Sequence, residues 1–499
     1  MNLGLSLLAT AERTPAAEAL VDGHTRLDYA ALQGRAARLA GGLAGLGVGR
    51  GDRVAAVLKN RHETVELFWA CQWLGAWFVP LSWRVSPADV AYCVADAGAR
   101  IVLVEPASEE HAAALADVRL VSVGGASGCA LALDELRAAD PHPGALDLDD
   151  GAISIMLYTS GTTGRPKGVP RSHRAERAGG LSQALQHGYL HGDRTLGVMP
   201  LYHTMGDHSM LAMSLISGCY VCQPDWSAER ALELIERERV TSLYLAPTLF
   251  HDLVTHPGRP TRDLSSVRAL GYAGAAMTGA LVERCLEAFD PEVFVNHYGS
   301  TEIYTFSLDA NQRAKPGCAG RPALNARLRL VRPEPGAGPD DLAPPGAEGE
   351  IACQLTSDEA FAGYWNRPDA DAKAIRDGWY LTGDLGRLDE DGDLWIVGRV
   401  DDMIISGGEN IHPLEVEDAL ARHPKVREVA VIGAPDDRWG QRVVACVVAD
   451  AGTTPDELDA FLLDGGALAR FKRPREYRLV EALPKSASGK ILRRVLRDA

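Results

Sequence analysis

The chain has 499 residues, which is too many for a single hydrophobic core, so we expect two or more domains. Hydrophobic residues make up 46% of the sequence and charged residues 24%, a balance that is typical of folded globular proteins and excludes a disordered chain. The formal net charge of -16 favours solubility and argues against a nucleic-acid-binding surface.

Two segments near the N-terminus bear on membrane association. Residues 1–14 carry no basic group ahead of their apolar residues, so they do not have the pattern of a signal peptide. Residues 67–83 form the most apolar window, but they include Gln72 and Pro80. We therefore expect a buried helix followed by a strand there, and no membrane span.

Helix and strand patterns alternate along most of the sequence. Residues 28–47 have helical periodicity, residues 52–58 have the pattern of a strand, and the alternation continues to about residue 330. This order predicts an α/β fold with layered sheets and helices. The Pro- and Gly-rich stretch 332–349 predicts an exposed loop between two strands.

A change of pattern near residue 400 predicts a domain boundary. The polar segment Gly398-Arg399-Val400-Asp401-Asp402 lies between apolar segments, and short strand and helix patterns typical of a small α+β unit follow it. We expect a large N-terminal domain over residues 1–400 and a smaller C-terminal domain over residues 401–499. The C-terminal patterns lie at residues 403–405, 413–421, 429–433, 442–448 and 455–463.

The nine cysteines are dispersed, and Cys219 and Cys222 form a C-x-x-C pair. This pair lies in a strand-like run, where residues three apart point to opposite faces, so the two thiols are not expected to bind one metal ion. An odd, dispersed set of cysteines is typical of a reducing compartment, and we expect a cytoplasmic protein.

The most informative segment is rich in glycine and hydroxyl groups and follows the apolar run 153–157. Glycines let backbone N–H groups approach an anion, and hydroxyl groups and a lysine add donors and charge, so the segment is suited to a triphosphate. The P-loop spacing is absent. The segment instead resembles the phosphate loop of the adenylate-forming enzymes, the superfamily of acyl-CoA synthetases, luciferases and adenylation domains; a flexible surface loop is the alternative. It runs Tyr158-Thr159-Ser160-Gly161-Thr162-Thr163-Gly164-Arg165-Pro166-Lys167-Gly168.

A second motif, Tyr298-Gly299-Ser300-Thr301-Glu302, follows the apolar run 293–295. A strand-end turn with an aromatic ring, two hydroxyl groups and a carboxylate is able to stack a purine and ligate Mg²⁺, whereas a solvated turn is the alternative. The turn resembles the nucleotide-binding turn of the adenylate-forming family. That resemblance implies a Mg²⁺ site made by Glu302 with Thr159.

Further motifs occur in the order that the family has. Asp384 resembles the aspartate that accepts both ribose hydroxyls, Arg399 the arginine that contacts ribose and phosphate, and Asp401 the hinge residue. Lys490, in Ser488-Gly489-Lys490, resembles the lysine that enters the site during adenylation, where a compact charge would bridge the carboxylate and the α-phosphate. A solvated terminal lysine is the alternative. The implied nucleotide contacts are Thr159, Ser160, Gly161, Thr162, Thr163, Gly164, Lys167, Gly274, Ala275, Ala276, Tyr298, Gly299, Ser300, Thr301, Asp384 and Arg399.

The resemblance is closest to aryl-CoA ligases such as 4-chlorobenzoate:CoA ligase, and it covers nearly the whole chain. It implies that Trp439 and Phe471 contact the adenine end of CoA, and that Arg473 and Arg84 pair with its phosphates. Gly407-Gly408 belongs to the face of the C-terminal domain that enters the site for thioester formation. A packed Trp-Gly turn and a solvated basic stretch are the alternatives.

The same resemblance implies where the carboxylic acid binds. His203 matches a histidine that gates the pocket, although a hydrogen-bonded core histidine is the alternative. The polar residues after Glu302 and at Asp207 would either read a ring substituent or stand behind the pocket. Gly179 and Gly180 lie near where the related ligase has a pocket aromatic, so we expect them to enlarge the pocket. The predicted lining is His203, Thr204, Met205, Asp207, Gly274, Ala275, Ala276, Ile303, Tyr304 and Thr305.

Together these motifs predict a two-step ligase with the fold of the adenylate-forming enzymes. ATP, with Mg²⁺, and a carboxylic acid give an acyl-adenylate, with Lys490 and Glu302 as catalytic residues and His203 as the gate. The C-terminal domain then turns about Asp401 and coenzyme A takes the acyl group. We expect a benzoate-type acid with a hydroxy or amino group. A medium- or long-chain acyl-CoA synthetase, an enzyme that loads a carrier-protein pantetheine and a non-enzymatic binding protein are the alternatives. The oligomeric state stays open, with a homodimer as one option.

Overall fold

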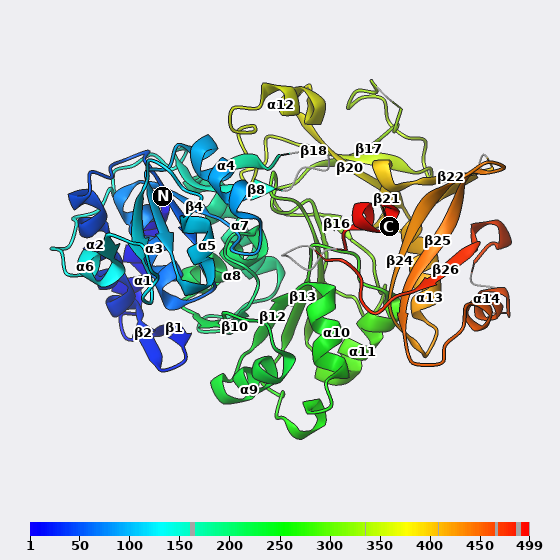
Figure 1. The fold of residues 1–499 in the computed structure, drawn as a ribbon, viewed down its shortest axis with the longest axis horizontal. Helices are drawn as coiled ribbons and strands as arrows, with labels where there is room; N and C mark the ends of the chain where they lie inside the picture. Colours follow the sequence, from blue (N-terminus) through cyan, green and yellow to red (C-terminus); the bar gives the residue numbers. More distant parts are fainter. Residues whose placement is uncertain (160–164, 335, 408, 465–467, 486–490, 499) are drawn as a thin grey trace.

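The computed structural model describes residues 1–159, 165–334, 336–407, 409–464, 468–485 and 491–498. Over these residues the chain forms four β-sheets with helices packed on them (Figure 1). Three sheets make up a large N-terminal part, and the fourth lies in a separate C-terminal lobe on the right of Figure 1. The layered α/β architecture that the sequence predicts is therefore confirmed.

Two large sheets form the body of the N-terminal part. Their orders are β16-β15-β14-β13-β12-β10-β11-β1-β2 and β7-β6-β5-β3-β4-β8-β9. Inner strands pair in parallel, as expected where helices connect successive strands. The first sheet comprises β1 (Glu18–Asp22), β2 (Thr25–Asp28), β10 (Arg194–Gly197), β11 (Cys219–Cys222), β12 (Ser242–Leu245), β13 (Ala269–Tyr272), β14 (Val293–Tyr298), β15 (Ser307–Asp309) and β16 (Arg321–Pro322). The second comprises β3 (Arg53–Val57), β4 (Trp77–Pro80), β5 (Ile101–Val104), β6 (Arg119–Ser122), β7 (Leu131–Ala132), β8 (Ile153–Thr159) and β9 (Lys167–Ser172).

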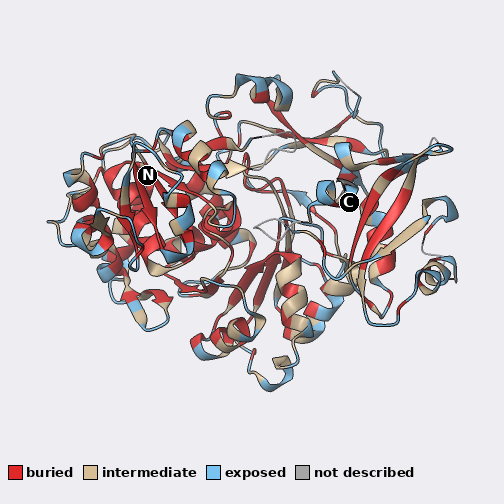
Figure 2. Cartoon of the chain, in the orientation of Figure 1, coloured by how far each residue is buried: buried red, intermediate tan, exposed pale blue. Residues whose placement is uncertain are grey.

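Two helices join these sheets in an inner layer. α7 (His173–Gln186) contacts β8 and β9, α8 (Thr204–Leu215) contacts β10, β11 and β12, and the two helices pack on each other. Figure 2 shows the resulting buried interior in red. The other helices of the N-terminal part are α1 (Leu3–Arg13), α2 (Tyr29–Gly45), α3 (His62–Leu74), α4 (Pro87–Ala97), α5 (Glu109–Ala112), α6 (Leu133–Arg137), α9 (Ala228–Glu238), α10 (Pro247–Thr255), α11 (Gly279–Phe289) and α12 (Pro368–Ala374).

A five-stranded antiparallel sheet leads from this body to the C-terminal lobe. Its order is β17-β18-β20-β19, with β21 paired to β20. The predicted Pro- and Gly-rich loop connects β17 to β18. The strands are β17 (Leu328–Val331), β18 (Gly349–Gln354), β19 (Ile375–Arg376), β20 (Trp379–Leu388) and β21 (Leu394–Arg399).

The C-terminal lobe is a small α+β unit with its own hydrophobic core. Its sheet has the order β23-β22-β25-β24, with β26 paired to β25. The two buried clusters on this sheet contain only residues from Ile404 onward, so the lobe is folded around side chains of its own. Its elements are β22 (Ile404–Ser406), β23 (Glu409–Ile411), α13 (Pro413–Ala421), β24 (Val426–Asp436), β25 (Gly440–Ala449), α14 (Pro455–Asp464), β26 (Glu476–Leu479) and α15 (Arg493–Asp498).

One predicted loop is shorter than expected. The sequence predicts a loop over residues 158–168, but β8 continues to Thr159 and β9 begins at Lys167. Antiparallel pairing extends both strands, because Thr159 lies opposite Lys167 and Tyr158 lies opposite Gly168. Ser160, Gly161, Thr162, Thr163 and Gly164 connect the two strands and lie outside the described residues.

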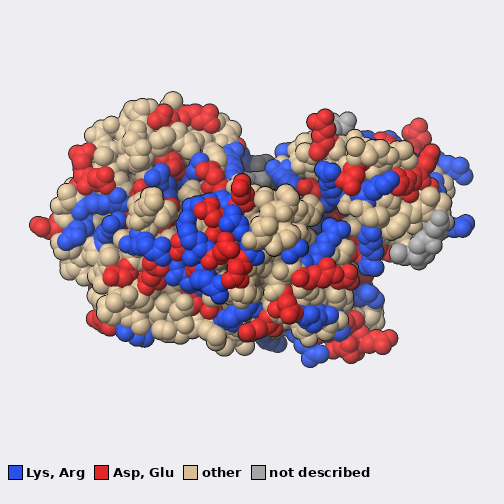
Figure 3. Space-filling model, turned by 90° about the horizontal axis from the view of Figure 1, so that it is seen from below, with Lys and Arg blue, Asp and Glu red and all other residues tan. Residues whose placement is uncertain are grey.

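Arginine and glutamate side chains form an ion-pair network on β1, β2, β10 and α9. Arg26 pairs with Glu18 and Glu238, and Arg194 pairs with the same two glutamates. Figure 3 shows positive and negative side chains interspersed on the face that contains these elements. The charges on this face are therefore matched at close range.

No helix in the described part of the chain combines the length and the apolar character that crossing a membrane requires. All nine cysteines are free thiols, and Cys219 and Cys222 lie in strand β11 as predicted. Burial raises the pKa of Cys219 to about 12, so this thiol stays protonated and unreactive.

Candidate functional site

The β8–β9 hairpin places Lys167 beside an aromatic ring and a carboxylate. Lys167 Nζ lies 3.9 Å from the centre of the Tyr364 ring, and the Tyr364 hydroxyl donates a 2.6 Å hydrogen bond to Oε1 of Glu302. Burial lowers the pKa of Lys167, and the charge of Glu302 opposes that shift. A cation, a π face and a carboxylate therefore meet at the end of this hairpin.

The predicted turn over residues 298–302 directly follows β14. The Ser300 hydroxyl accepts hydrogen bonds from the backbone N–H groups of Glu302 at 3.1 Å and Ile303 at 3.4 Å. A Cβ at Gly299 would lie 1.7 Å from the carbonyl oxygen of Tyr304, so only glycine fits this close approach. The turn is thus rigidly held, with Glu302 directed toward Tyr364.

Glu302 has the donor atoms that a Mg²⁺ site needs. The residue is 7% exposed, and within the described part of the chain its Oε2 atom accepts no hydrogen bond. A buried carboxylate requires a cation or donors, and Mg²⁺ prefers oxygen ligands. The Thr159 hydroxyl, from the end of β8, is the second predicted ligand. This donor set fits Mg²⁺ bound together with a triphosphate.

Asp384 is the centre of a second polar group. Its Oδ2 accepts a hydrogen bond from the Tyr298 hydroxyl and its Oδ1 accepts one from Arg399, both at 2.7 Å. Strand pairing sets Asp384 directly opposite Arg399 on β20 and β21. Burial and the charge of Asp384 raise the pKa of Tyr298. Three residues predicted to bind nucleotide are thus brought together.

Tyr364 and Arg171 belong to this region, yet the sequence motifs do not single them out. Arg171 is fully buried in β9 and donates hydrogen bonds to the carbonyl oxygens of Thr301 at 2.8 Å and Glu359 at 3.1 Å. A signal for Tyr364 exists in Gly363-Tyr364-Trp365, where Gly363 has a φ of 114°. Only glycine adopts such a conformation readily, so two adjacent aromatic rings after it indicate a constrained site.

The predicted pocket residues differ in accessibility. His203 caps α8, where its Nδ1 accepts a 3.2 Å hydrogen bond from the N–H of Met205, and its side chain is half-buried. Thr204 and Met205 are buried in the first turn of the helix. Gly274-Ala275-Ala276 follows β13 and is exposed. His203 and this loop are therefore the accessible edge of the predicted pocket.

The rings of Tyr304 and His208 fill the space over Gly179. The rings stack with centres 3.7 Å apart, and a Cβ on Gly179 would lie 2.4 Å from Nε2 of His208. A Cβ on Gly180 would lie 3.0 Å from Cδ1 of Leu215. The expectation that these two glycines enlarge the pocket is therefore wrong, because side chains of α8 already occupy the space.

Replacing Gly179 with alanine is expected to lower the free energy of unfolding by about 1–3 kcal/mol, the usual cost of overpacking a core. The thermal unfolding midpoint measures this effect. Gly34→Ala is the matched control, because Gly34 lies inside α2 and its added Cβ has no neighbour within 4 Å. The control should gain about 0.5–1 kcal/mol. A Gly179→Ala protein as stable as the control would contradict the close packing.

Asp207, Ile303, Tyr304 and Thr305 are enclosed by protein in this structure, each with at most 2% of its surface exposed. The Tyr304 hydroxyl donates a 2.6 Å hydrogen bond to Gln183, and the N–H of Thr305 donates one of 2.9 Å to Glu359. These two groups have partners within the protein, whereas Oδ2 of Asp207 and Oγ1 of Thr305 are buried without a hydrogen bond among the described residues. The four residues form a layer behind the accessible edge of the pocket, the second of the two roles that the sequence leaves open.

Three predicted CoA residues lie in the C-terminal lobe. The guanidinium groups of Arg438 and Arg475 lie against the Trp439 ring, with their Cζ atoms 4.8 Å and 4.7 Å from the ring centre. Phe471 is 44% exposed. Arg473 forms an ion pair with Asp459. An exposed ring and several cations therefore occupy one lobe surface, as a phosphorylated nucleotide requires.

The other residues predicted to bind CoA are Arg84, Gly407 and Gly408. Arg84 is exposed after β4, with its guanidinium 4.9 Å from the centre of the Trp83 ring. A Cβ on Gly407 would lie 2.6 Å from Cε3 of Trp439, so this glycine packs under the tryptophan. Gly408 lies outside the described residues. Arg84 lies in the N-terminal part, and Trp439 lies in the lobe between β24 and β25.

Asp401 is exposed in the short 3-10 helix Val400–Asp402, which connects β21 to β22. The next residue, Asp402, forms a 2.7 Å ion pair with Arg497 from the last helix. Among the residues that the structure describes, two side-chain hydrogen bonds link the lobe to the N-terminal part: His412 with Glu348 at 2.7 Å, and Asp418 with the backbone N–H of Gly279 at 3.3 Å. The predicted hinge position is thus a solvated connection between two separately packed units.

Lys490 lies outside the described residues, but its flanking residues are placed. Lys485 and Ile491 pair as a β-bridge. Burial raises the pKa of Asp252 on α10, while hydrogen bonds from His251 and Trp226 and the charge of Lys485 bring it below the ordinary value. Lys485, which precedes this segment, is therefore close enough to the N-terminal part for its charge to act on Asp252.

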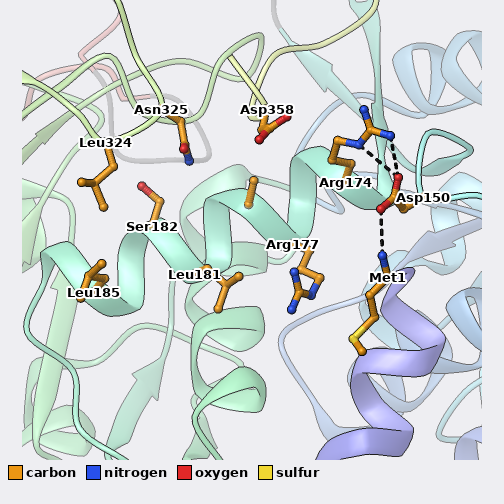
Figure 4. Close-up of a pocket in the computed structure, with 11 residues that line it drawn as sticks. Met1, Asp150, Arg174, Arg177, Leu181, Ser182, Leu185, Leu324, Asn325 and Asp358 are labelled. Carbon is orange, nitrogen blue, oxygen red and sulfur yellow. Dashed lines mark hydrogen bonds and ion pairs between the residues drawn. The ribbon is translucent and has the colours of Figure 1, made fainter. Parts of the chain in front are cut away.

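A cavity of about 290 Å³ lies on the outer face of α7 and is separate from these residues. Figure 4 shows Arg177, Leu181 and Leu185 on the helix face that borders it, with Asp150 linking Met1 to Arg174. Glu176, Gly179 and Gln183 are buried on the opposite face of the helix, toward α8. None of the predicted site residues lines this cavity, so it is not the candidate active site.

Comparisons with known proteins agree with this geometry. Residues 7–365 match the family described as AMP-binding enzyme, and residues 415–490 match the AMP-binding enzyme C-terminal domain. A feruloyl-CoA synthase from Amycolatopsis sp is 37% identical over 99% of this chain and 98% of its own length. A 4-chlorobenzoate–CoA ligase from Arthrobacter sp is 35% identical over 100% of this chain and 95% of its own length.

A solved structure has the same fold. The crystal structure of the anthranilate CoA ligase AuaEII in complex with anthranoyl-AMP superimposes with a TM-score of 0.92 and 27% sequence identity, covering 100% of this chain and 97% of that one. The family match spans most of both parts of the chain, and the relatives match along their whole length. The chain therefore belongs to the AMP-binding enzyme family and has the adenylate-forming fold, with a large N-terminal and a small C-terminal domain.

Proposed function

We propose that this protein is an AMP-forming acid–thiol ligase that converts a carboxylic acid, ATP and CoA into an acyl-CoA, AMP and pyrophosphate. The observation that carries the proposal is the meeting of Lys167, Tyr364 and Glu302 beside the pair made by Tyr298 and Asp384. A cation for phosphate, a carboxylate for Mg²⁺ and an acceptor for a diol are the groups that adenylation by ATP requires.

In the first half-reaction, a carboxylate oxygen of the acid attacks the α-phosphorus of ATP, and pyrophosphate leaves. Lys167 binds the phosphates, and Asp384 accepts the ribose hydroxyls. Glu302 and Thr159 would hold Mg²⁺, which when bound would neutralise negative charge on the triphosphate. Lys490 stabilises the charge that develops at the pentavalent phosphorus. The product is an acyl-adenylate that the closed site protects from water.

In the second half-reaction, the CoA sulfur attacks the acyl carbon, the bond from that carbon to AMP breaks, and AMP leaves. We propose that the lobe, residues 401–499, first turns about Asp401 so that Trp439 and Arg84 form one CoA site. Each pose then supplies different residues to one site.

We propose an aromatic acid as the substrate class. The names of the feruloyl-, 4-chlorobenzoate- and anthranilate-activating relatives support this class. The test is AMP release from ATP and Mg²⁺ with benzoates, hydroxy- and aminobenzoates, cinnamates and fatty acids, each with and without CoA. CoA-dependent turnover of one aromatic acid is expected. A preference for fatty acids would contradict the proposed substrate class. AMP release whose rate does not increase when CoA is added would indicate a carrier-protein pantetheine as the acceptor.

Replacing Phe471 with alanine is expected to raise the KM for CoA about 10-fold, because stacking on a base contributes about 1–3 kcal/mol. Adenylation and the unfolding temperature should stay unchanged, since the ring is exposed. The measurement is thioester formation at varied CoA concentration. Leu479→Ala is the matched control, because Leu479 is also exposed in the lobe and has no predicted CoA contact. The same KM for both variants would remove Phe471 from the CoA site.

A further inference from the structure

One face of strand β9 is directed at the turn that follows β14. Lys167, Val169 and Arg171 share this face, because side chains alternate along a strand. Lys167 lies against Tyr364, and Val169 packs in one hydrophobic cluster with Ile303 and Phe306. Arg171, like Val169, is fully buried. A single strand thus contacts the turn from its surface to its base.

Arg171 holds both ends of the turn over residues 301–305. Its Nη1 group donates hydrogen bonds to the carbonyl oxygens of Thr301 at 2.8 Å and Glu359 at 3.1 Å. The Glu359 carboxylate in turn accepts a 2.9 Å hydrogen bond from the N–H of Thr305 and another of 2.9 Å from Asn325. The guanidinium therefore fixes the peptide that precedes Glu302 and supports the residue that orders the far end of the turn.

The buried arginine is neutralised by a carboxylate of α7, and a second acidic side chain, Asp207 of α8, lies beside that carboxylate. Glu176 of α7 forms an ion pair with Arg171, and both side chains are fully buried. Burial raises the pKa of Asp207, and the charge of Glu176 raises it further, so Asp207 keeps its proton. His208 is neutral, since burial lowers its pKa to about 4. One positive and one negative charge remain, and the cluster is neutral overall.

The hydrogen-bond partners of these buried polar atoms agree with a neutral His208 and a protonated Asp207. The Nδ1–H of His208 donates a 3.0 Å hydrogen bond to the carbonyl of Thr204, which leaves Nε2 as an acceptor. One ligand atom from each of Glu176, Asp207 and His208 lies within 4.8 Å of the others. As ionised carboxylates, Glu176 and Asp207 would each have an oxygen without a partner. A proton on Asp207 resolves this, because a carboxylic acid is able to donate to its neighbour.

We propose that Arg171 is a positioning residue, which fixes the 301–305 turn from beneath so that Glu302 and Tyr298 are held ready for the nucleotide. This inference rests on the proposed function, because it takes ATP as the ligand of the turn. Arg171 does not touch the reacting atoms in this scheme; it acts through the carbonyl of Thr301. Preorganisation of this kind raises the affinity for the nucleotide, because the turn is already ordered before binding and no binding free energy is lost in ordering it.

The test separates positioning from stability. Arg171→Met alone leaves Glu176 and two carbonyl groups unpaired and is expected to destabilise the fold. The double variant Arg171→Met/Glu176→Met removes both charges at similar volume and should recover most of the unfolding temperature. We expect it to bind a non-hydrolysable ATP analogue with Mg²⁺ at least ~10-fold more weakly than the unchanged protein, by calorimetry without any acid. Arg171→Lys, which keeps the charge, should recover part of the affinity.

A matched control addresses destabilisation as such. Arg268 precedes β13, at the sheet edge opposite the turn, and pairs with Asp193. Arg268→Met should lower the unfolding temperature without changing the affinity for the analogue. Equal affinities of the double variant and the unchanged protein would overturn the positioning role. Failure of the unchanged protein to bind the analogue would overturn the proposed function, and this inference with it. If the purified protein contained one metal ion per chain and Asp207→Asn removed that ion, the cluster of Glu176, Asp207 and His208 would be a metal site. That result would also overturn the positioning role of Arg171.

Discussion

Replacing Lys490 with alanine is expected to slow acyl-adenylate formation by about 10²- to 10³-fold, the usual effect of removing one group that stabilises transition-state charge. CoA-dependent consumption of supplied acyl-adenylate should stay within about twofold of the unchanged protein, because we propose that Lys490 leaves the site before this step. Pyrophosphate release measures the first half-reaction, and thioester formation from synthetic acyl-AMP measures the second.

Lys485→Ala provides the control for Lys490. Lys485 has the same charge and lies in the same C-terminal segment, but its ammonium pairs with Glu428 at 2.8 Å. This variant should retain both half-reactions, because an exposed ion pair contributes little to stability. Equal loss of both half-reactions in Lys490→Ala would show that the residue acts on folding or on both steps, and would remove it from its assigned role.

Replacing Glu176 with glutamine is expected to lower the free energy of unfolding by about 3–5 kcal/mol, because Arg171 then has no opposite charge in a fully buried position. The urea midpoint and the thermal unfolding midpoint both measure this loss. Glu236→Gln is the control, since Glu236 pairs with Arg262 at the surface, and it should leave both midpoints unchanged. A Glu176→Gln protein as stable as this control would contradict the buried ion pair.

Replacing Asp207 with asparagine is expected to raise the free energy of unfolding at neutral pH. The folded pKa of Asp207 is raised, so the folded protein keeps a proton that the unfolded chain releases above about pH 3.8. Wild-type stability therefore falls as pH rises from this value toward the folded pKa, and asparagine abolishes that loss. The stabilisation from Glu176, whose pKa is lowered because Arg171 outweighs its burial, is present above about pH 4.5 and lost in acid. Unfolding midpoints against pH for both variants check these signs.

Local patterns predict the strands and turns of the site well. The turn after β14 and the arginine at the end of β21 lie where strand patterns end in polar motifs, whereas Asp384 lies within β20. Such features depend on a few neighbouring residues, so a single sequence contains the information. The boundaries of α2 and of the C-terminal elements agree with the predicted ranges for the same reason.

Contacts between distant segments could not be predicted in this way. Arg171 binds Thr301, 130 residues away, and Glu359, 188 residues away, so only the folded sheet order brings them together. The wrong prediction for Gly179 has the same cause. A small residue in a helix suggests open space, but the ring of His208 from a neighbouring helix fills it. The shape of a pocket depends on which side chains pack against each residue that lines it, and a local sequence motif does not show which distant side chains those are.

The separate hydrophobic core of the C-terminal lobe has an energetic consequence. Because its buried clusters contain no residue from the N-terminal part, turning the lobe exposes none of that core to water. The contacts that must break on turning include two polar ones at the boundary, from His412 and Asp418. Such contacts contribute about 0.5–1.5 kcal/mol each, so the two poses lie close in free energy. Two such contacts amount to about 1–3 kcal/mol. A ligand that binds one pose roughly 200-fold better than the other is then able to reverse their populations, and the succession of substrates can drive the lobe through its cycle.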